Sequence, residues 1–234
     1  MLKDFEEDIH REELERIYLS FFSDKLRVGI IGGGKAAAIK IRTLLKKNIY
    51  VEALAKEFSE EILSVSDEKL ILIRSDYNEE FIKDKHLIII AINDNKLLGE
   101  IKNQCERNYK LYINCSDFRD GMGVMPVQRS LNNISFGLST NSGNPKGALL
   151  ASNLAIESLK DIDSFLGFIG ILRNNAKKLT YHKSYIIEFI NSDDFKFFWD
   201  KGKDKIVLNL FFDKDDVEYL YRYRGDVNGD SDCN

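Results

Sequence analysis

Cysteine, histidine and proline are scarce in this chain of 234 residues, which has three cysteines, three histidines and two prolines. Cys105, Cys115 and Cys233 are too few and too far apart for a disulfide framework or a zinc knuckle, which favours a reducing compartment. The histidines are scattered and show none of the short spacings that are typical of metal ligands. We therefore expect no metal site.

Long hydrophobic runs and blocks of basic residues are also missing. The longest apolar runs are far too short to span a bilayer, and a formal net charge of −4 without a basic block argues against nucleic acid as a partner. Residues 1–18 are acidic and have neither the cationic start nor the apolar core of a signal peptide. We expect a cytoplasmic protein, and 44% hydrophobic residues suffice for one substantial core and a smaller second unit.

The strongest positive signal lies in residues 26–40, LRVGIIGGGKAAAIK, where a run of β-branched residues ends in three glycines and an alanine-rich segment. This order is typical of a first parallel strand that delivers a dinucleotide phosphate to a helix N-terminus. Gly32 permits the tight turn, Gly34 lets a pyrophosphate approach the backbone, and Ala37 allows the helix to pack closely on the strand. The alternative is a glycine-rich turn that binds nothing.

Strand and helix patterns alternate over the first half of the chain. We expect strands at 26–31, 49–55, 70–73, 86–92 and 110–114, and helices at 34–47, 58–64, 78–83 and 95–108. The alternation predicts an α/β fold with a Rossmann-type, doubly wound parallel sheet. Apolar residues at helical spacing over 4–22 predict one more helix, which would cover a face of this domain.

The alternation then stops. Extended runs at 122–129 and 134–139 precede helical patterns at 145–178, 181–189, 193–199 and 217–223, and the last ten residues are polar and predicted to be disordered. We therefore expect three parts: a dinucleotide-binding domain over 1–118, a small α+β region over 119–160 and a helical region over 161–234.

An acidic residue after the second strand is expected to hold the ribose diol of NAD. Glu57 lies at about the right distance from the glycines, whereas Glu52 also fits by count but falls inside the predicted strand. Lys56 complicates the choice, because a cation at this place could accept the 2′-phosphate of NADP. We favour NAD, with solvated loop residues as the alternative interpretation.

Polar residues follow the fourth and fifth predicted strands. Asn93 and Asp94 come after one of them and Asp117 after the other, so all three are expected at the edge of the sheet where ligands bind. A carboxylate beside a nicotinamide is a suitable general base, which makes Asp117 the candidate. Caps or turns are the alternative for both aspartates. Cys115 has no histidine close in sequence and is better explained as a small buried residue.

The loop over residues 139–145, STNSGNP, is rich in hydroxyl and amide side chains and leads into a predicted helix. Ser139, Thr140 and Asn141 could donate hydrogen bonds to carboxylates at that helix N-terminus. The alternative is an ordinary connection with Pro145 at the first helical position.

Five segments taken together are more specific than any one of them. In chain order they are GIIGGGKAAAIK, IIAIND, YINCSD, VMP and LSTNSGNP. Their order and spacing over residues 26–155 resemble the precorrin-2 dehydrogenase family, the module of siroheme synthases that oxidises precorrin-2 with NAD. Bifunctional members of that family also insert ferrous iron into the product, sirohydrochlorin.

The resemblance implies a role for individual residues. The positions that match the family's cofactor contacts are Gly32, Gly33, Gly34, Lys35, Ala36, Lys56, Glu57, Asn93 and Asp94. Asp117 matches the family's acid/base, and Thr140, between Ser139 and Asn141, matches the hydroxyl position of its substrate loop. The resemblance also implies a homodimer whose contacts come largely from residues 122–160.

The chain departs from the family pattern in several places. The double glycine of the substrate loop is Asn141-Ser142, and Ile39 replaces an arginine of the first helix. The changed loop bears on substrate contacts more than on cofactor binding. Precorrin-2 carries eight carboxylates, so cations are expected to bind it. The candidates are Arg129, Lys146 and Arg173.

Two other functions remain open at this point. Iron insertion, with ferrous iron as a substrate, would use Asp117 as proton acceptor, and no metal-binding signature is needed because the macrocycle is the main ligand. A catalytically silent NAD- or tetrapyrrole-binding protein of the same fold is the second. A relative of glutamyl-tRNA reductase would need a cysteine near the N-terminus, and the first 104 residues contain none.

Overall fold

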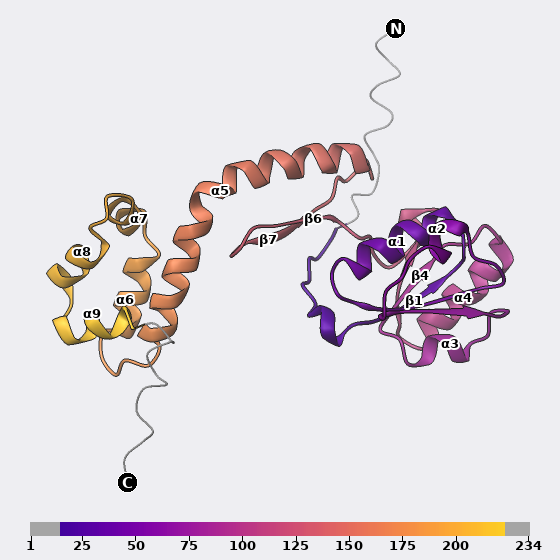
Figure 1. The fold of residues 1–234 in the computed structure, drawn as a ribbon, viewed down its shortest axis with the longest axis horizontal. Helices are drawn as coiled ribbons and strands as arrows, with labels where there is room; N and C mark the ends of the chain where they lie inside the picture. The colour runs from indigo at the N-terminus through magenta and orange to yellow at the C-terminus, as the bar shows by residue number, and fades with distance from the viewer. Residues whose placement is uncertain (1–14, 223–234) are drawn as a thin grey trace, which may run out of the picture. The chain divides into compact units, whose positions relative to one another are not determined.

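The computed structural model describes residues 15–222, shown in Figure 1. These residues form two compact units. The first contains the described residues up to Pro126 together with Asn141–Gly143, and the second contains Val127–Thr140 and the described residues from Asn144 onward. The expected division into three parts stays a prediction.

The first unit is built on a five-stranded parallel sheet in the order β3-β2-β1-β4-β5. Its strands are β1 Arg27–Ile31, β2 Tyr50–Ala55, β3 Leu70–Arg74, β4 Leu87–Ile90 and β5 Leu111–Asn114. Its helices are α1 Lys35–Leu45, α2 Glu60–Leu63, α3 Glu80–Lys83 and α4 Asn95–Arg107, with 3-10 turns η1 Ser23–Lys25 and η2 Phe118–Asp120. The predicted Rossmann-type sheet is confirmed. Strand order reverses between β1 and β4, which is where such sheets bind ligands.

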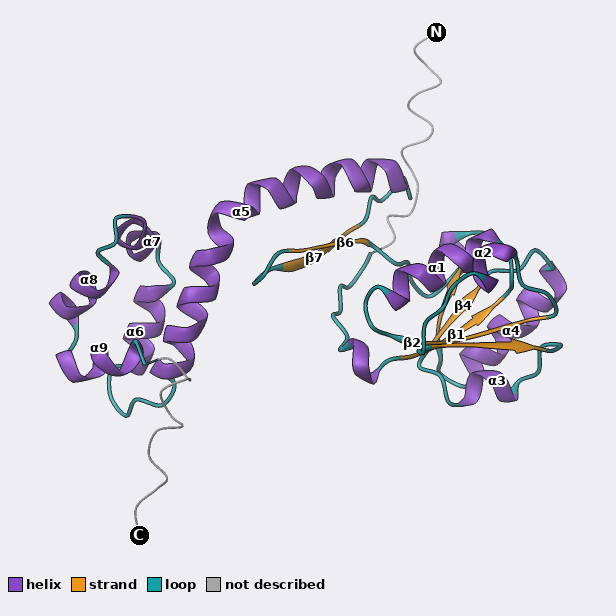
Figure 2. Cartoon of the chain, viewed as in Figure 1, coloured by secondary structure: helices purple, strands orange, loops and turns teal. Residues whose placement is uncertain are grey.

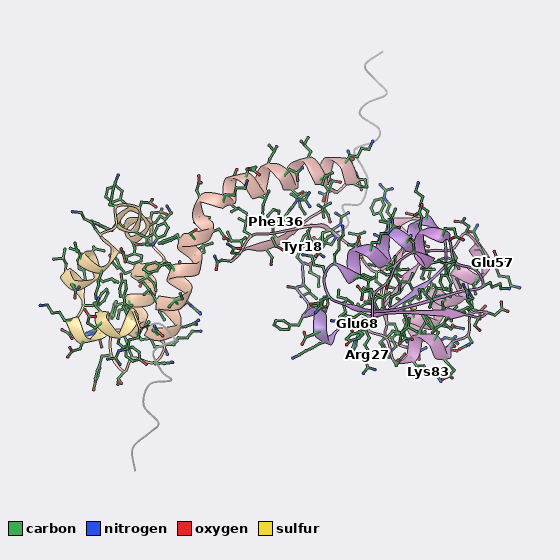
Figure 3. The ribbon with its side chains drawn as sticks, viewed as in Figure 1. Tyr18, Arg27, Glu57, Glu68, Lys83 and Phe136 are labelled. Carbon is green, nitrogen blue, oxygen red and sulfur yellow. The ribbon has the colours of Figure 1, made fainter. Side chains whose placement is uncertain are left out.

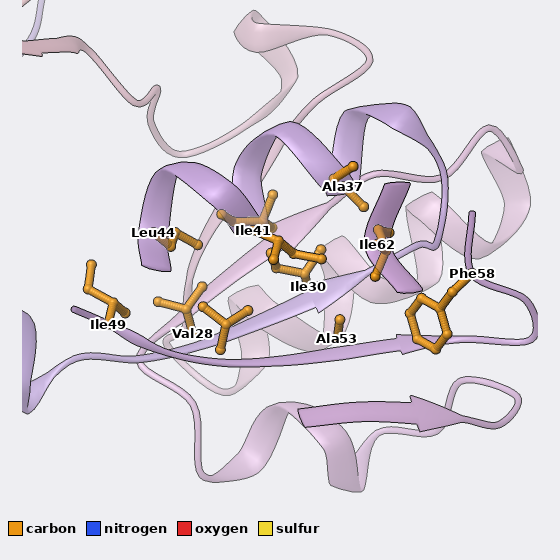
Figure 4. Packing of buried hydrophobic residues seen from close by; sticks show 12 residues of the cluster. Val28, Ile30, Ala37, Ile41, Leu44, Ile49, Ala53, Phe58 and Ile62 are labelled. Carbon is orange, nitrogen blue, oxygen red and sulfur yellow. The ribbon is translucent and has the colours of Figure 1, made fainter. Parts of the chain in front are cut away.

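Helices cover both faces of this sheet because neighbouring strand residues point to opposite sides. Ile30 lies in the core between the sheet and the helices α1 and α2. Figure 4 shows Ala37, Ile41 and Leu44 of α1, which belong to the same core. Ile31 lies in the opposite core, which α3 and α4 close. The strands are therefore apolar on both faces, as buried parallel strands are.

The second unit is a β-hairpin followed by helices (Figure 2). The antiparallel hairpin pairs β6 Val127–Ser130 with β7 Ser135–Leu138. The helices are α5 Pro145–Ala176, α6 Lys183–Ile190, α7 Asp193–Asp200, α8 Asp204–Phe211 and α9 Lys214–Leu220. The expected helices at 145–178, 181–189 and 193–199 are confirmed. The sequence pattern did not predict α8, and α9 begins three residues before the expected start at residue 217.

The helices α5–α9 share an aromatic core. Phe165 and Phe168 of α5 contact Phe195 and Trp199 of α7, with ring centroids 5.4–6.5 Å apart. Such pairs add to the stabilisation that burial of the rings provides. The aromatic residues near the end of the chain thus serve the packing of this unit.

The prediction of a helix over 4–22 is wrong for its described part. Residues 15–22 are not helical, and residues 4–14 lie outside the described range. The apolar side chains assigned to a buried face stay exposed, with Ile17 87% and Phe22 76% accessible, and Tyr18 is labelled in Figure 3. A single amphipathic helix is marginal without a surface to pack on, so periodicity alone was insufficient here. The predicted disordered tail also lies outside the described residues.

None of the helices described in residues 15–222 combines the length and the hydropathy that a membrane-spanning helix needs.

A buried carboxylate fixes the turn of the hairpin to α5. Asp163 is 6% exposed and accepts hydrogen bonds from the backbone N–H of Asn133, at 3.0 Å, and from its side-chain amide, at 3.3 Å. Gly167 makes the approach possible, because a Cβ there would lie 2.6 Å from Oδ1 of Asn133. Removal of this carboxylate would leave a part-buried N–H without its acceptor, which is costly.

We therefore expect Asp163→Ala to lower the free energy of unfolding of the second unit by about 1–3 kcal/mol. Urea unfolding followed by the fluorescence of Trp199, the one tryptophan of the chain, measures this. Asp161→Ala is the matched control, since Asp161 is exposed on the same helix. Equal stability of the two variants would contradict the structural role of Asp163.

Candidate functional site

The first two glycines of the motif are packed against backbone from neighbouring strands. Gly32 has a φ of 128°, and a Cβ there would lie 2.2 Å from the carbonyl oxygen of Ala91, after β4. A Cβ at Gly33 would lie 1.9 Å from the carbonyl oxygen of Glu57, after β2. Both positions therefore require glycine. The amide N–H of Ser59 donates to the Gly33 carbonyl at 2.8 Å, which fixes the turn from the other side.

Gly34 differs from the two preceding glycines because the space at its Cβ position is empty. Among the described residues, a Cβ at this position meets no heavy atom within 4 Å. Gly34 is the N-cap of α1, and Lys35 and Ala36 in the first turn are also exposed. The free N–H groups of a helix N-terminus attract anions, and the missing Cβ leaves room for one.

Ser59 supplies a second sign of a ligand near this turn. Its hydroxyl oxygen is buried and, within the part of the chain that the structure describes, has no hydrogen-bond partner. Buried polar groups without a partner are rare in folded proteins. The turn and its surroundings therefore fit a dinucleotide, with the diphosphate at the start of α1.

Lys56 and Glu57 lie directly after β2, as the sequence predicts, and both are exposed. The ammonium group of Lys56 forms an ion pair with Asp76 after β3, at 2.6 Å. Glu52, the alternative acid, forms an ion pair at 2.9 Å with Lys85, whose side chain is only 3% exposed. This leaves Glu57 as the better candidate for the ribose.

Asn93 and Asp94 follow β4, which lies beside β1 in the sheet. The Asp94 carboxylate caps α4, since it accepts hydrogen bonds from the N–H groups of Lys96 at 2.9 Å and Leu97 at 3.1 Å. The capping interpretation of Asp94 therefore holds, and it is compatible with a place at the ligand edge. Asn93 is exposed one residue earlier.

Asp117 follows β5 and is exposed. One of its oxygens accepts a hydrogen bond from the N–H of Arg119 at 3.0 Å, which caps η2. Ser116, the preceding residue, donates its hydroxyl hydrogen to the carbonyl of Ile92 after β4, at 3.2 Å. The Asp117 loop is therefore attached to the end of the neighbouring strand.

A buried asparagine at the end of β5 also fixes this loop through hydrogen bonds. The Asn114 side chain, 3% exposed as a residue, donates to Asp120 at 3.0 Å and accepts from the N–H of Ser116 at 2.9 Å. Asp120 also forms an ion pair with Lys102 of α4. None of Asn114, Asp120 and Lys102 is among the site residues that the sequence predicts. The detectable signal was a polar residue closing the apolar strand LYIN.

Cys115 lies at the same edge but is not a reactive thiol. Burial raises its pKa, and the nearby Lys40 lowers it to a smaller extent. The thiol therefore stays protonated at neutral pH and packs with the core beneath α1.

The loop over residues 139–145 is divided between the units. Asn141–Gly143 pack with the first unit, where Gly143 has a φ of 70° and its Cβ position lies 2.4 Å from the Phe118 ring. Asn141 thus belongs to the unit that carries Asp117. Ser139 and Thr140 belong to the second unit, and the Thr140 hydroxyl accepts from the N–H of Asn144 at 2.7 Å.

The three candidate cations for an acidic substrate all lie in the second unit. The Arg129 guanidinium donates to Oδ1 of Asn153 from two nitrogens, at 2.8 and 3.2 Å, and is thereby fixed to α5. Lys146 and Arg173 are exposed on that helix.

Also in the second unit, His182, Asp213 and Asp216 place possible metal-ligand atoms within 4.8 Å of one another. The two aspartates lie at the start of α9, where the helix dipole favours carboxylates without a metal. We assign no function to this group.

Comparison with known proteins agrees with this geometry. A family model described as "Putative NAD(P)-binding" matches residues 21–126. A siroheme synthase from Ruthia magnifica subsp. Calyptogena magnifica is 26% identical over 188 residues, which is 78% of this chain and 37% of that protein. A siroheme synthase from Mannheimia succiniciproducens is 30% identical over 97 residues, 40% of this chain and 20% of that protein.

The fold comparison extends beyond the sheet. The structure of SirC, a precorrin-2 dehydrogenase, superimposes with a TM-score of 0.60 at 20% identity and covers 83% of this chain and 98% of SirC. The chain thus shares the fold of SirC, whereas its matches span well under half of each siroheme synthase. These findings confirm the resemblance to the precorrin-2 dehydrogenase family.

The charge on Asp120 gives the Asp117 loop a pH-dependent stability. Its hydrogen bond with Lys102 holds the pKa of this carboxyl below its usual range, and Asn114 contributes. Because the folded pKa is lowered, the stabilisation is present above the unfolded-state pKa, about 3.9, and is lost as the pH falls through the folded pKa.

We therefore expect Asp120→Asn to be less stable than the wild type at pH 7, with a difference that shrinks below about pH 4. Urea midpoints measured between pH 7 and pH 3 test this, with the exposed Glu68→Gln as the control. A difference that stays constant over this range would show that the charge of Asp120 is irrelevant.

Proposed function

We propose that this chain is an NAD-dependent dehydrogenase that oxidises precorrin-2 to sirohydrochlorin. The observation that carries the proposal is the open Gly34 at the start of α1, beside the point where strand order reverses. Asp117, the candidate base, follows β5 at the same edge of the sheet. The confirmed resemblance supplies the substrate class.

Each part of the cofactor has residues that suit it. The diphosphate would be held by the backbone of Gly34, Lys35 and Ala36 at the start of α1, where N–H groups and the helix dipole favour an anion. The Glu57 carboxylate would accept hydrogen bonds from the ribose hydroxyls. Asn93 follows β4, which lies beside β1 at the point where strand order reverses. NAD supplies the acceptor for a hydride.

The role of Asp117 in the oxidation is to take a proton. The substrate loses a hydride and a proton as conjugation extends, and the proton needs an acceptor. One carboxylate oxygen of Asp117 is occupied by the N–H of Arg119, which orients the group and leaves the second oxygen for the proton. Ser116 and Asn114 hold this loop and so keep the base in place.

The substrate and partner assignments follow from the resemblance and remain part of the proposal. Ser139, Thr140 and Asn141 would contact substrate carboxylates, with Lys146 and Arg173 as cations. A homodimer through residues 122–160 is the expected assembly. Iron insertion would use the same Asp117 carboxylate, since two pyrrole protons leave when ferrous iron, as substrate, enters the product.

The cofactor site can be tested without the tetrapyrrole. We expect Gly34→Ala to fold normally, because its Cβ meets no described atom, and to lose NAD affinity by at least about tenfold, because the methyl group would separate the diphosphate from the backbone donors. Isothermal titration with NAD and thermal unfolding measure the two effects.

Gly99→Ala is the matched control, since its Cβ position in α4 is open as well and lies within a helix rather than at the turn. This variant should bind NAD like the wild type. Unchanged affinity of Gly34→Ala would remove the turn as a diphosphate site.

The base is tested by turnover. We expect Asp117→Asn to bind NAD with wild-type affinity but to lower kcat for NADH formation from precorrin-2 by about 10²–10⁴-fold, as loss of a general base does. The assay is anaerobic, with absorbance recorded for NADH and the tetrapyrrole. An unchanged kcat would assign the proton to another group, and NAD binding by a wild type without turnover would favour the silent binding protein.

A further inference from the structure

The end of β2 carries a charge arrangement that concerns which dinucleotide binds. β2 and β3 are parallel neighbours, with Ala55 opposite Arg74 in register, and the N–H of Ser75 donates to the Ala55 carbonyl at 3.3 Å. In the segments that directly follow these two strands, Nζ of Lys56 lies 2.6 Å from Oδ1 of Asp76. Both side chains are more than three-quarters exposed, so the pair lies on the surface of the site.

Glu57 follows Lys56 in the chain, and its backbone lies against the glycine turn. Its carbonyl oxygen occupies the space that a Cβ of Gly33 would need. In dinucleotide-binding folds an acid at the end of β2 holds the 2′-hydroxyl of NAD, whereas a cation nearby, usually an arginine, accommodates the 2′-phosphate of NADP. Lys56 carries such a positive charge, but its ammonium group is paired with Asp76.

We propose that Asp76 is a specificity-determining residue that makes this chain select NAD over NADP by neutralising Lys56. This inference rests on the proposed function, because it assumes that a dinucleotide lies on the turn. With Asp76 in place, Lys56, Glu57 and Asp76 carry one net negative charge, which repels an added phosphate. Without it, the three positions are neutral together and the ammonium group can turn to the phosphate.

The hydrogen bond with Asp76 is also the largest cause of the raised pKa of Lys56, so the lysine is charged throughout the physiological range. Arg74, the last residue of β3, is a second exposed cation at this edge. Arg74 is not a member of the ion pair and stays in place in every variant below, so the experiment separates its contribution from that of Lys56.

The test is equilibrium binding of NAD and NADP to the full chain, measured by isothermal titration with thermal unfolding as a check on the fold. We expect Asp76→Asn to leave NAD affinity unchanged and to raise NADP affinity on the order of fivefold, as expected for an exposed charge interaction. The gain should shrink at high salt, since exposed charges are screened.

Two variants identify the cause. The double variant Lys56→Gln/Asp76→Asn should lose the gain, because the freed lysine is gone while Arg74 remains. Glu80→Gln is the matched control: it makes the same charge change and frees Lys83 from an exposed ion pair on α3. Figure 3 shows Lys83 and Glu57 at separate borders of the unit, so this variant should bind both nucleotides like the wild type.

The outcomes separate the inference from the function on which it rests. A wild type that binds NAD, together with an Asp76→Asn variant whose ratio of NADP to NAD affinity is unchanged, would overturn the inference and leave the proposed function standing. A gain that persists in the double variant would also overturn it, since the freed lysine would not be the cause. A wild type that binds neither nucleotide would overturn the proposed function and the inference with it.

Discussion

The close approach of three strand ends around Gly32 and Gly33 is the constraint on which the first unit depends. Carbonyl oxygens after β4 and β2 occupy the space where side chains would otherwise stand at these two positions. The backbone itself therefore forms the ligand edge of the sheet, and the next residue, Gly34, is left open at the start of α1. Loss of either packed glycine would force apart the strands that carry the other candidate residues.

Much of this arrangement could be predicted because local pattern and packing agree. Apolar residues on both faces of the strands indicate a buried parallel sheet, and Ala37, Ile41 and Leu44 occur at the spacing of one buried helix face. The turn could be predicted too, since the glycines stand between strand and helix. Residues 15–22 show where this reasoning fails: their periodicity is helical, but the apolar side chains are exposed and no helix forms.

The contacts that tune the site could not be read from the sequence, because they depend on which strand ends and loops the fold brings together. Lys56 meets Asp76 only because β2 and β3 are neighbours in register. Lys102 reaches Asp120 because α4 packs beside β5, after which Asp120 lies. Asn114 fixes the Asp117 loop because its amide nitrogen donates to Asp120 and its amide oxygen accepts from the N–H of Ser116. Residue type and spacing suggest the Asp117 carboxylate as the base, whereas the contacts that fix its loop follow from the three-dimensional arrangement.

The proposed reaction needs an NAD site and a base at the same sheet edge, which together oxidise a reduced tetrapyrrole. The most direct measurement is a single-turnover experiment under anaerobic conditions, with excess wild-type protein, precorrin-2 and NAD, in which NADH and sirohydrochlorin are both quantified. We expect the two products to form together in equal amounts. Sirohydrochlorin without NADH, or neither product from a protein that binds NAD, would contradict the proposed reaction.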